Sequence, residues 1–69
     1  MSDHVYKVIE LVCSSTTGVD DAIQNAITKA SKTIRHMDWF EVVETRGAIK
    51  EGKVAHYQVA IKLGFTLED

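Results

Sequence analysis

The sequence predicts an α+β domain in which a three-stranded antiparallel sheet packs on one helix, in the order β-α-β-β. Three observations support this prediction. A run rich in β-branched residues lies near the N-terminus, apolar residues then recur at helical spacing, and two alternating runs follow, separated by Glu51-Gly52. With 69 residues the chain has room for a single domain, which we take to span residues 1–69.

The first predicted strand covers residues 5–12 (VYKVIELV), where β-branched and aromatic residues are enriched. Alternation gives it two mostly apolar faces, one formed by Val5, Ile9 and Leu11 with Lys7, and the other by Tyr6, Val8 and Val12 with Glu10. Because both faces are apolar, both are expected to be covered, one by the helix and the other by another subunit.

A loop and a helix follow this strand. Residues 13–18 are small and polar, and Thr17 with Asp20 resembles a capping box in which aspartate replaces glutamate. From residue 19 to residue 36 the helical spacing is carried by Val19, Ile23, Ala26, Ile27, Ala30 and Ile34. Acidic residues at the start of this segment and basic ones at its end, including His36, suit the helix dipole. The pattern predicts a helix over residues 19–36.

The last two predicted strands, residues 39–50 and 53–67, form a hairpin around Glu51-Gly52. The core face of the final strand is expected to carry Ala55, Tyr57, Val59, Ile61, Leu63 and Phe65. A hairpin closed at this point pairs Trp39 with Gly64, Val43 with Ala60, and Thr45 with Gln58.

The composition limits the possible functions. The chain is 45% hydrophobic and 26% charged with a net charge of −2, so no basic surplus favours binding to nucleic acid. The single cysteine, Cys13, excludes an internal disulfide, and the three widely spaced histidines form no metal-ligand motif. Because so small a domain usually needs such a crosslink or oligomerisation, we expect a homo-oligomer.

No apolar run approaches the roughly 18–20 residues that span a bilayer. The first residues also lack the basic and apolar regions of a signal peptide. We therefore expect a soluble cytoplasmic protein without a membrane partner.

Trp39 and Phe40 are adjacent, so alternation along a strand directs them to opposite faces of the sheet. The sequence predicts that Phe40 faces the core and that Trp39 shares the other face with Gln58. Six residues of strand separate these two side chains along the hairpin, a distance on the order of 20 Å. They could share a ligand only if a neighbouring subunit brings its copy close.

Several segments together resemble the dodecin family over nearly the whole chain. They are residues 5–12, 38–42 (DWFEV), 45–47 (TRG), 57–59 (YQV) and 63–68 (LGFTLE). The resemblance implies a hollow dodecamer that binds flavins between subunits. It implies that Trp39 stacks on the isoalloxazine ring and that Gln58 hydrogen-bonds its polar edge. We further expect Val43 and Ala60, which lie on the same predicted face, to line the slot. Indole stacking and the mixed donor and acceptor of a glutamine amide suit such a ring.

By the same resemblance, the function is storage or sequestration of a flavin (FMN, riboflavin or FAD) with protection from light and without catalysis. Arg46 is expected to contact a phosphate or to form a salt bridge between subunits, with neither role preferred. Tyr6 and Lys7 are candidate contacts for the phosphate tails of FMN or coenzyme A, with a structural role at least as plausible.

The chain departs from the resemblance at two positions. Thr66 stands where bacterial members often carry arginine, which weakens the expectation of coenzyme A or phosphate binding more than that of flavin stacking. Cys13 stands where the family typically has glycine, and its place before a helix would lower its thiol pKa, although an ordinary thiol is the preferred reading.

Two other functional classes remain open. A flavin-dependent reductase would need a nicotinamide or substrate pocket beside the flavin, and the sequence supplies no acid–base or nucleophile–base pair for one. An assembly module that binds coenzyme A or no flavin would form the same oligomer.

Overall fold

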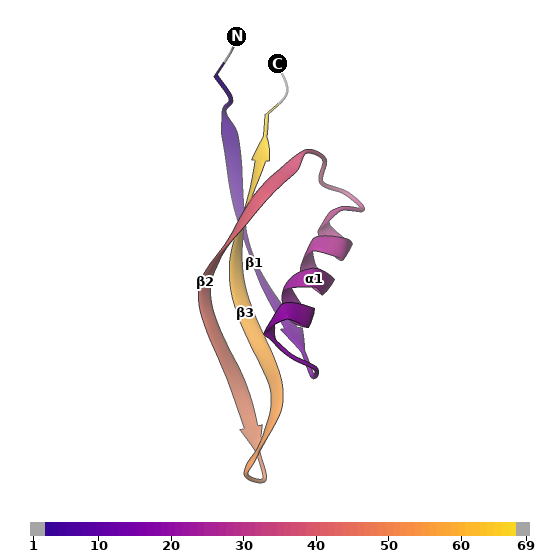
Figure 1. The fold of residues 1–69 in the computed structure, drawn as a ribbon, viewed down its shortest axis with the longest axis vertical. Coiled ribbons are helices and arrows are strands. Elements are labelled where there is room, and N and C mark those ends of the chain that lie inside the picture. The colour runs from indigo at the N-terminus through magenta and orange to yellow at the C-terminus, as the bar shows by residue number, and fades with distance from the viewer. Residues whose placement is uncertain (1–2, 68–69) are drawn as a thin grey trace.

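A computed structural model describes residues 3–67 and shows the predicted order of elements (Figure 1). Strand β1 (Tyr6–Ser15) leads into helix α1 (Val19–Ala30), and strands β2 (Met37–Lys50) and β3 (Lys53–Thr66) form the hairpin. The sheet is antiparallel with β3 between its neighbours, in the order β1-β3-β2. The predicted α+β fold is therefore confirmed. Glu68, which closes the last dodecin-like segment, lies outside the described residues.

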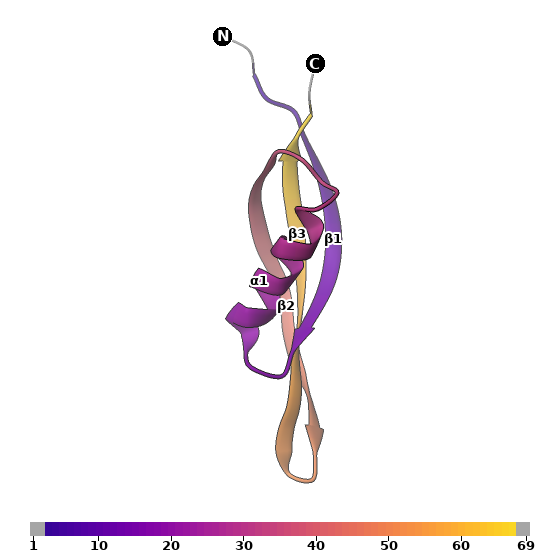
Figure 2. The same ribbon diagram turned by 90° about the vertical axis from the view of Figure 1, so that its right-hand side faces the viewer.

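Helix α1 covers one face of the sheet, where it packs on β1 and β3 (Figure 2). The buried core there consists of Cys13, Ala22, Val59, Ile61 and Leu63. Three of these come from alternate positions of β3, because the central strand is flanked on both sides and covered by the helix. The hairpin of β2 and β3 extends beyond the helix (Figure 1), so much of β2 stays uncovered.

The predicted helix is too long at its C-terminal end. It ends at Ala30, and the amides of Ser31, Thr33 and Ile34 bond to carbonyls of the last turn. His36 has a φ of 63°, which a helix cannot contain, so it lies in the loop before β2 and is no helix-terminal cation. Only Lys29 of the basic residues occupies the last helical turn within residues 3–67.

The predicted capping box is also absent. Gly18 is the N-cap residue of α1, and no side chain caps the helix. Instead the Ser15 hydroxyl accepts hydrogen bonds from the amides of Thr17 and Gly18, at 2.9 and 3.3 Å, and donates one to Oδ2 of Asp21 at 2.6 Å. Ser15 thus organises the turn into the helix.

Strand β1 continues through Cys13, which the sequence pattern had assigned to the loop. Cys13 pairs with Val59, is buried, and donates a hydrogen bond from Sγ to the Val59 carbonyl at 3.2 Å. Burial raises the pKa of its thiol above the ordinary value, so the lowered pKa considered for a loop position before a helix is wrong. The sulfur here is part of the core.

Three irregularities interrupt the pairing of β2 with β3. Trp39 pairs with Gly64 as predicted, and the register holds as far as Val42 and Ile61. A bulge at Val43 then shifts it by one residue, so that Glu44 pairs with Ala60. The predicted pairs of Val43 with Ala60 and of Thr45 with Gln58 are wrong for this reason.

Candidate functional site

The face of the sheet that points away from α1, here called the outer face, carries most of the candidate residues. Leu63 lies in the core, so the next residue of β3, Gly64, points to the outer face. Paired residues of antiparallel strands share a face, and the strand partners of Gly64 therefore lie on the outer face as well. In cross-strand rows this face presents Val8, Gly64 and Trp39; Glu10, Lys62 and Glu41; Val12, Ala60 and Glu44; and Ser14, Gln58 and Arg46.

Trp39 dominates the first of these rows. Its ring centroid lies 6.3 Å from that of Tyr6 on β1, at an interplanar angle of 61°, an edge-to-face contact. Since β3 separates β1 from β2, the indole reaches across the central strand at Gly64. Trp39 as a residue remains 40% exposed, so part of its surface is open to a ligand.

A hydrogen bond beside Trp39 fastens the start of β2. Thr66 Oγ1 donates to Oδ2 of Asp38, which lies in the bulge just before Trp39. The amide of Thr66 also bonds to the carbonyl of His36 at 3.1 Å. These two bonds join the end of β3 to the residues that lead into Trp39.

A second group of candidates lies in the last row. Arg46 is directly opposite Gln58, which has Ser14 on its other side. Arg46 forms an exposed ion pair with Glu44 of the same strand. The structure therefore brings Gln58 and Arg46 together. The register predicted from the sequence had no bulge and placed Thr45, one residue earlier, opposite Gln58.

The two groups do not meet within one chain. The rows of Lys62 and of Ala60 lie between Trp39 and Gln58, which supports the predicted separation of about six residues along β3. Ala60 is buried, whereas Val43 beside it is 49% exposed. Any single ligand that touches both Trp39 and Gln58 must therefore lie across two chains or bridge the intervening rows.

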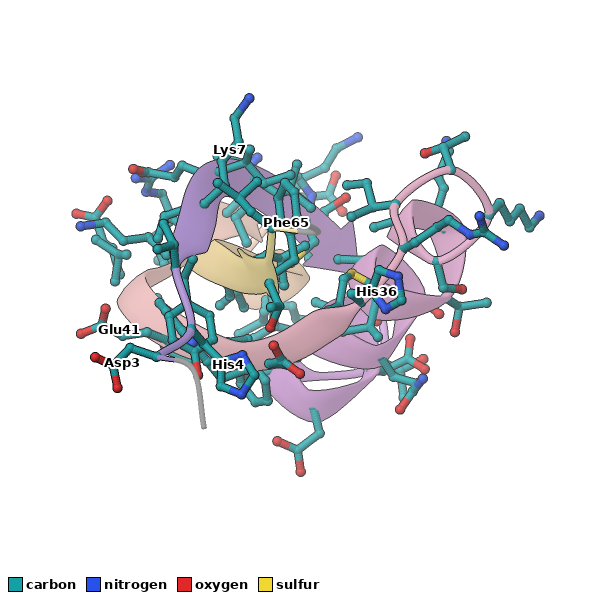
Figure 3. All side chains as sticks on the ribbon, turned by 90° about the horizontal axis from the view of Figure 1, so that it is seen from above. Asp3, His4, Lys7, His36, Glu41 and Phe65 are labelled. Atoms are coloured by element: carbon teal, nitrogen blue, oxygen red, sulfur yellow. The ribbon has the colours of Figure 1, made fainter. Side chains whose placement is uncertain are left out.

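Lys7 lies on the other face of the sheet. It pairs with Phe65, whose neighbours Leu63 and Ile61 belong to the same alternating set, and Figure 3 shows Lys7 and Glu41 extending in different directions. One chain thus brings Tyr6, but not Lys7, to the indole.

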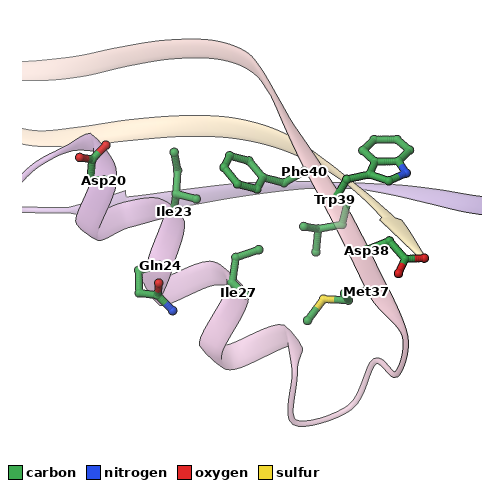
Figure 4. Close-up of a pocket in the computed structure, with 9 residues that line it drawn as sticks. Asp20, Ile23, Gln24, Ile27, Met37, Asp38, Trp39 and Phe40 are labelled. Carbon is green, nitrogen blue, oxygen red and sulfur yellow. The ribbon is translucent and has the colours of Figure 1, made fainter. Parts of the chain in front are cut away.

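The helix side of β2 has an open groove of about 420 Å³. Both Trp39 and Phe40 are among the residues that line the groove, but Figure 4 shows Phe40 directed toward Ile23 of the helix and the indole of Trp39 turned away from the helix. The two aromatic neighbours therefore occupy opposite faces, as predicted. Phe40 is nevertheless half exposed, because α1 packs on β1 and β3 and leaves β2 open.

Metal binding and membrane insertion are two further functions that the described residues bear on. Within residues 3–67 no group of three or more His, Cys, Asp or Glu side chains is placed to hold a metal ion. In the same part of the chain, no helix combines the length and the apolar character needed to cross a membrane.

Comparisons with known proteins agree on one family. The family model described as Dodecin matches residues 5–68. A curated Dodecin from Thermus thermophilus is 54% identical over 65 residues, which is 94% of either chain. The solved structure of dodecin from Streptomyces coelicolor has a TM-score of 0.93 and 56% identity, covering 100% of this chain and 99% of its own.

A more distant structure is the calcium dodecin of Mycobacterium tuberculosis, described as having a novel calcium-binding site. It is 26% identical with a TM-score of 0.79, and the match covers 93% of this chain and 91% of that one.

Proposed function

Because this chain belongs to the dodecin family, we propose that it binds a flavin by stacking the isoalloxazine ring on Trp39, and that it stores the flavin and protects it from light. The observation that supports the proposal is the partly exposed indole of Trp39 on the outer face, which packs against Tyr6 and can be reached by a flat ligand. Stacking on an indole favours a flat, electron-poor ring by about 0.5–1.5 kcal/mol beyond area burial.

In this proposal the site is completed between subunits of a dodecamer. Trp39 and Gln58 lie too far apart in one chain to hold one isoalloxazine ring, so a second copy supplies the other group. The outer face also leaves Tyr6, Val8 and Val12 about half exposed or more. An apolar sheet face of this kind is stabilised when another subunit covers it.

Gln58 is proposed to orient the flavin, because its amide offers two donors and an acceptor to the mixed edge of the pyrimidine ring. Val43 and Ala60 would line the slot between the Trp39 and Gln58 rows. Arg46 and Tyr6 lie on the same face and are available to a phosphate tail, whereas Lys7 could reach a ligand only from another subunit.

The bound flavin is proposed to be held without turnover. Close stacking of indole on an electron-poor ring opens electron transfer that drains the excited state of the flavin, and this accounts for photoprotection without a substrate. Riboflavin needs no phosphate contact and is the simplest ligand for this chain. Coenzyme A would need cationic contacts, and Thr66 supplies no charge.

The adjacent aromatic residues give a matched test. Trp39→Leu removes the stacking platform, and Phe40→Leu removes a ring from the opposite face of the same strand. We expect Trp39→Leu to weaken riboflavin and FMN binding by well over tenfold in an intact oligomer, and Phe40→Leu to change it less than threefold. Equal affinity of Trp39→Leu and the parent would show that the flavin does not stack on Trp39.

A further inference from the structure

Gly64 lies on the outer face, and its lack of a side chain leaves room for a neighbouring group. It lies inside the central strand β3, between Val8 on one side and Trp39 on the other. Glycine weakens a strand interior and often marks a place where another group approaches closely. Here the group that approaches is the indole.

The indole of Trp39 fills the space that a side chain at position 64 would need. A Cβ built on Gly64 would lie 2.6 Å from Cδ2 of the indole and closer still to Cε2 and Cζ2. Carbon atoms make no contacts at such distances, so either the ring or the strand would have to move. The backbone of Gly64 has no left-handed φ, so what this position requires is room and not conformational freedom.

Tyr6 closes the other side of this space. Its ring meets the indole edge to face, so the indole lies between Tyr6 and β2 with the backbone of Gly64 beneath it. A ring displaced by a methyl group on residue 64 could not slide toward β1 without striking Tyr6. The remaining direction is away from the sheet, toward the side on which the proposed flavin would stack on the indole.

We propose that Gly64 is a positioning residue for the ligand, because its bare backbone sets the place and tilt of the Trp39 ring. The inference rests on the proposed stacking of a flavin on Trp39. It predicts that adding one methyl group to residue 64 disturbs the indole first and flavin binding through it. Gly64 would hold the Trp39 ring in this position in the ligand-free protein, before a flavin binds.

The chain offers a matched control for Gly64→Ala. A Cβ at Gly18 would have no neighbour within 4 Å, and the φ of Gly18 is 170°, extended backbone that alanine adopts. Trp39 is the only tryptophan, so near-ultraviolet circular dichroism and tryptophan emission report on this ring directly. In ligand-free protein we expect both spectra to change in Gly64→Ala and to match the parent in Gly18→Ala.

Flavin binding supplies the second readout. We expect Gly64→Ala to weaken riboflavin binding by about two- to tenfold, the range that a lost aromatic stacking interaction gives, and Gly18→Ala to leave it unchanged. In a Trp39→Ala background, Gly64→Ala should change riboflavin affinity less than twofold, since the ring through which it acts is gone.

Each outcome decides the proposal. Unchanged tryptophan spectra in Gly64→Ala would overturn it, and so would an equal loss of affinity in both backgrounds. If the parent binds no riboflavin, the proposed function fails, while the ligand-free spectra still decide whether Gly64 positions the ring. If Gly64→Ala fails to assemble, the Gly64→Ala/Trp39→Ala double variant should assemble, and its failure too would show that the indole is not the obstacle.

Discussion

Thr66 donates a hydrogen bond from Oγ1 to Oδ2 of Asp38, and this bond ties the end of β3 to the bulge that precedes Trp39. The two residues are 28 positions apart in the sequence and meet because β2 and β3 pair antiparallel. Thr66, which carries no charge where bacterial dodecins often have arginine, therefore has a structural role next to the candidate ligand site.

Replacing Thr66 with valine removes this hydrogen bond and keeps the shape of the side chain. We expect Thr66→Val to lower the free energy of unfolding by about 1 kcal/mol, the usual net value of one hydrogen bond. The near-ultraviolet circular dichroism of Trp39 should weaken as the bulge loosens. Thr66→Ser retains the hydroxyl and serves as the control. A valine variant as stable as the serine variant would mean that the bond contributes nothing.

Tyr6 packs against the indole of Trp39 in an edge-to-face contact. We expect Tyr6→Ala to weaken riboflavin binding by about two- to tenfold, because the loss of one aromatic pair costs about 0.5–1.5 kcal/mol. Tyr6→Phe keeps the ring and should bind riboflavin as the parent does. If the phenylalanine variant loses as much affinity as the alanine variant, the phenolic hydroxyl contacts the ligand and the ring is secondary. Fluorescence titration distinguishes the two results.

Arg46 carries a cation on the outer face, where its ion pair with Glu44 is exposed and contributes little to stability. We expect Arg46→Ala to weaken FMN binding by about tenfold and riboflavin binding less than twofold, since a guanidinium binds phosphate and riboflavin has none. Glu44→Gln is the control that frees the arginine without removing it. Equal loss of both flavins, with a smaller oligomer by light scattering, would assign Arg46 to subunit contacts instead.

Cys13 provides a pH-dependent prediction. Burial holds the pKa of its thiol above the ordinary value of 9.0, so the folded state retains the proton more tightly than the unfolded state does. Stability from this group is therefore complete below that ordinary value and is lost as the pH rises toward the raised pKa. We expect the parent to lose more stability than Cys13→Ala as the pH rises above 9.0 in urea titrations. Parallel pH profiles would contradict this assignment.

The central strand was predictable because one simple pattern governs it. Residues 59, 61 and 63 alternate with smaller or polar residues, and a strand flanked on both sides and covered by a helix buries that set. The end of the helix was not predictable from the same kind of pattern. Ile34 and the basic residues after Lys29 fit a helix equally well, and the left-handed φ of His36 leaves no mark in the sequence.

The candidate site was predictable in part. Alternation placed Trp39 opposite Gly64 and on the face away from Phe40, and the structure agrees. It missed the bulge at Val43, which moves Arg46 opposite Gln58, because a bulge depends on tertiary pairing and not on local composition. The closeness of the indole to Gly64 also lay outside any one-dimensional pattern, since it depends on the side-chain torsions of Trp39.

The most direct measurement is a titration of purified, ligand-free protein into riboflavin, followed by flavin fluorescence. Stacking on Trp39 predicts strong quenching that saturates near one flavin per subunit, on particles whose size by light scattering is that of a dodecamer. Undiminished flavin fluorescence in the presence of an intact oligomer would contradict the account, because an assembled protein would then present the indole without using it to hold a flavin.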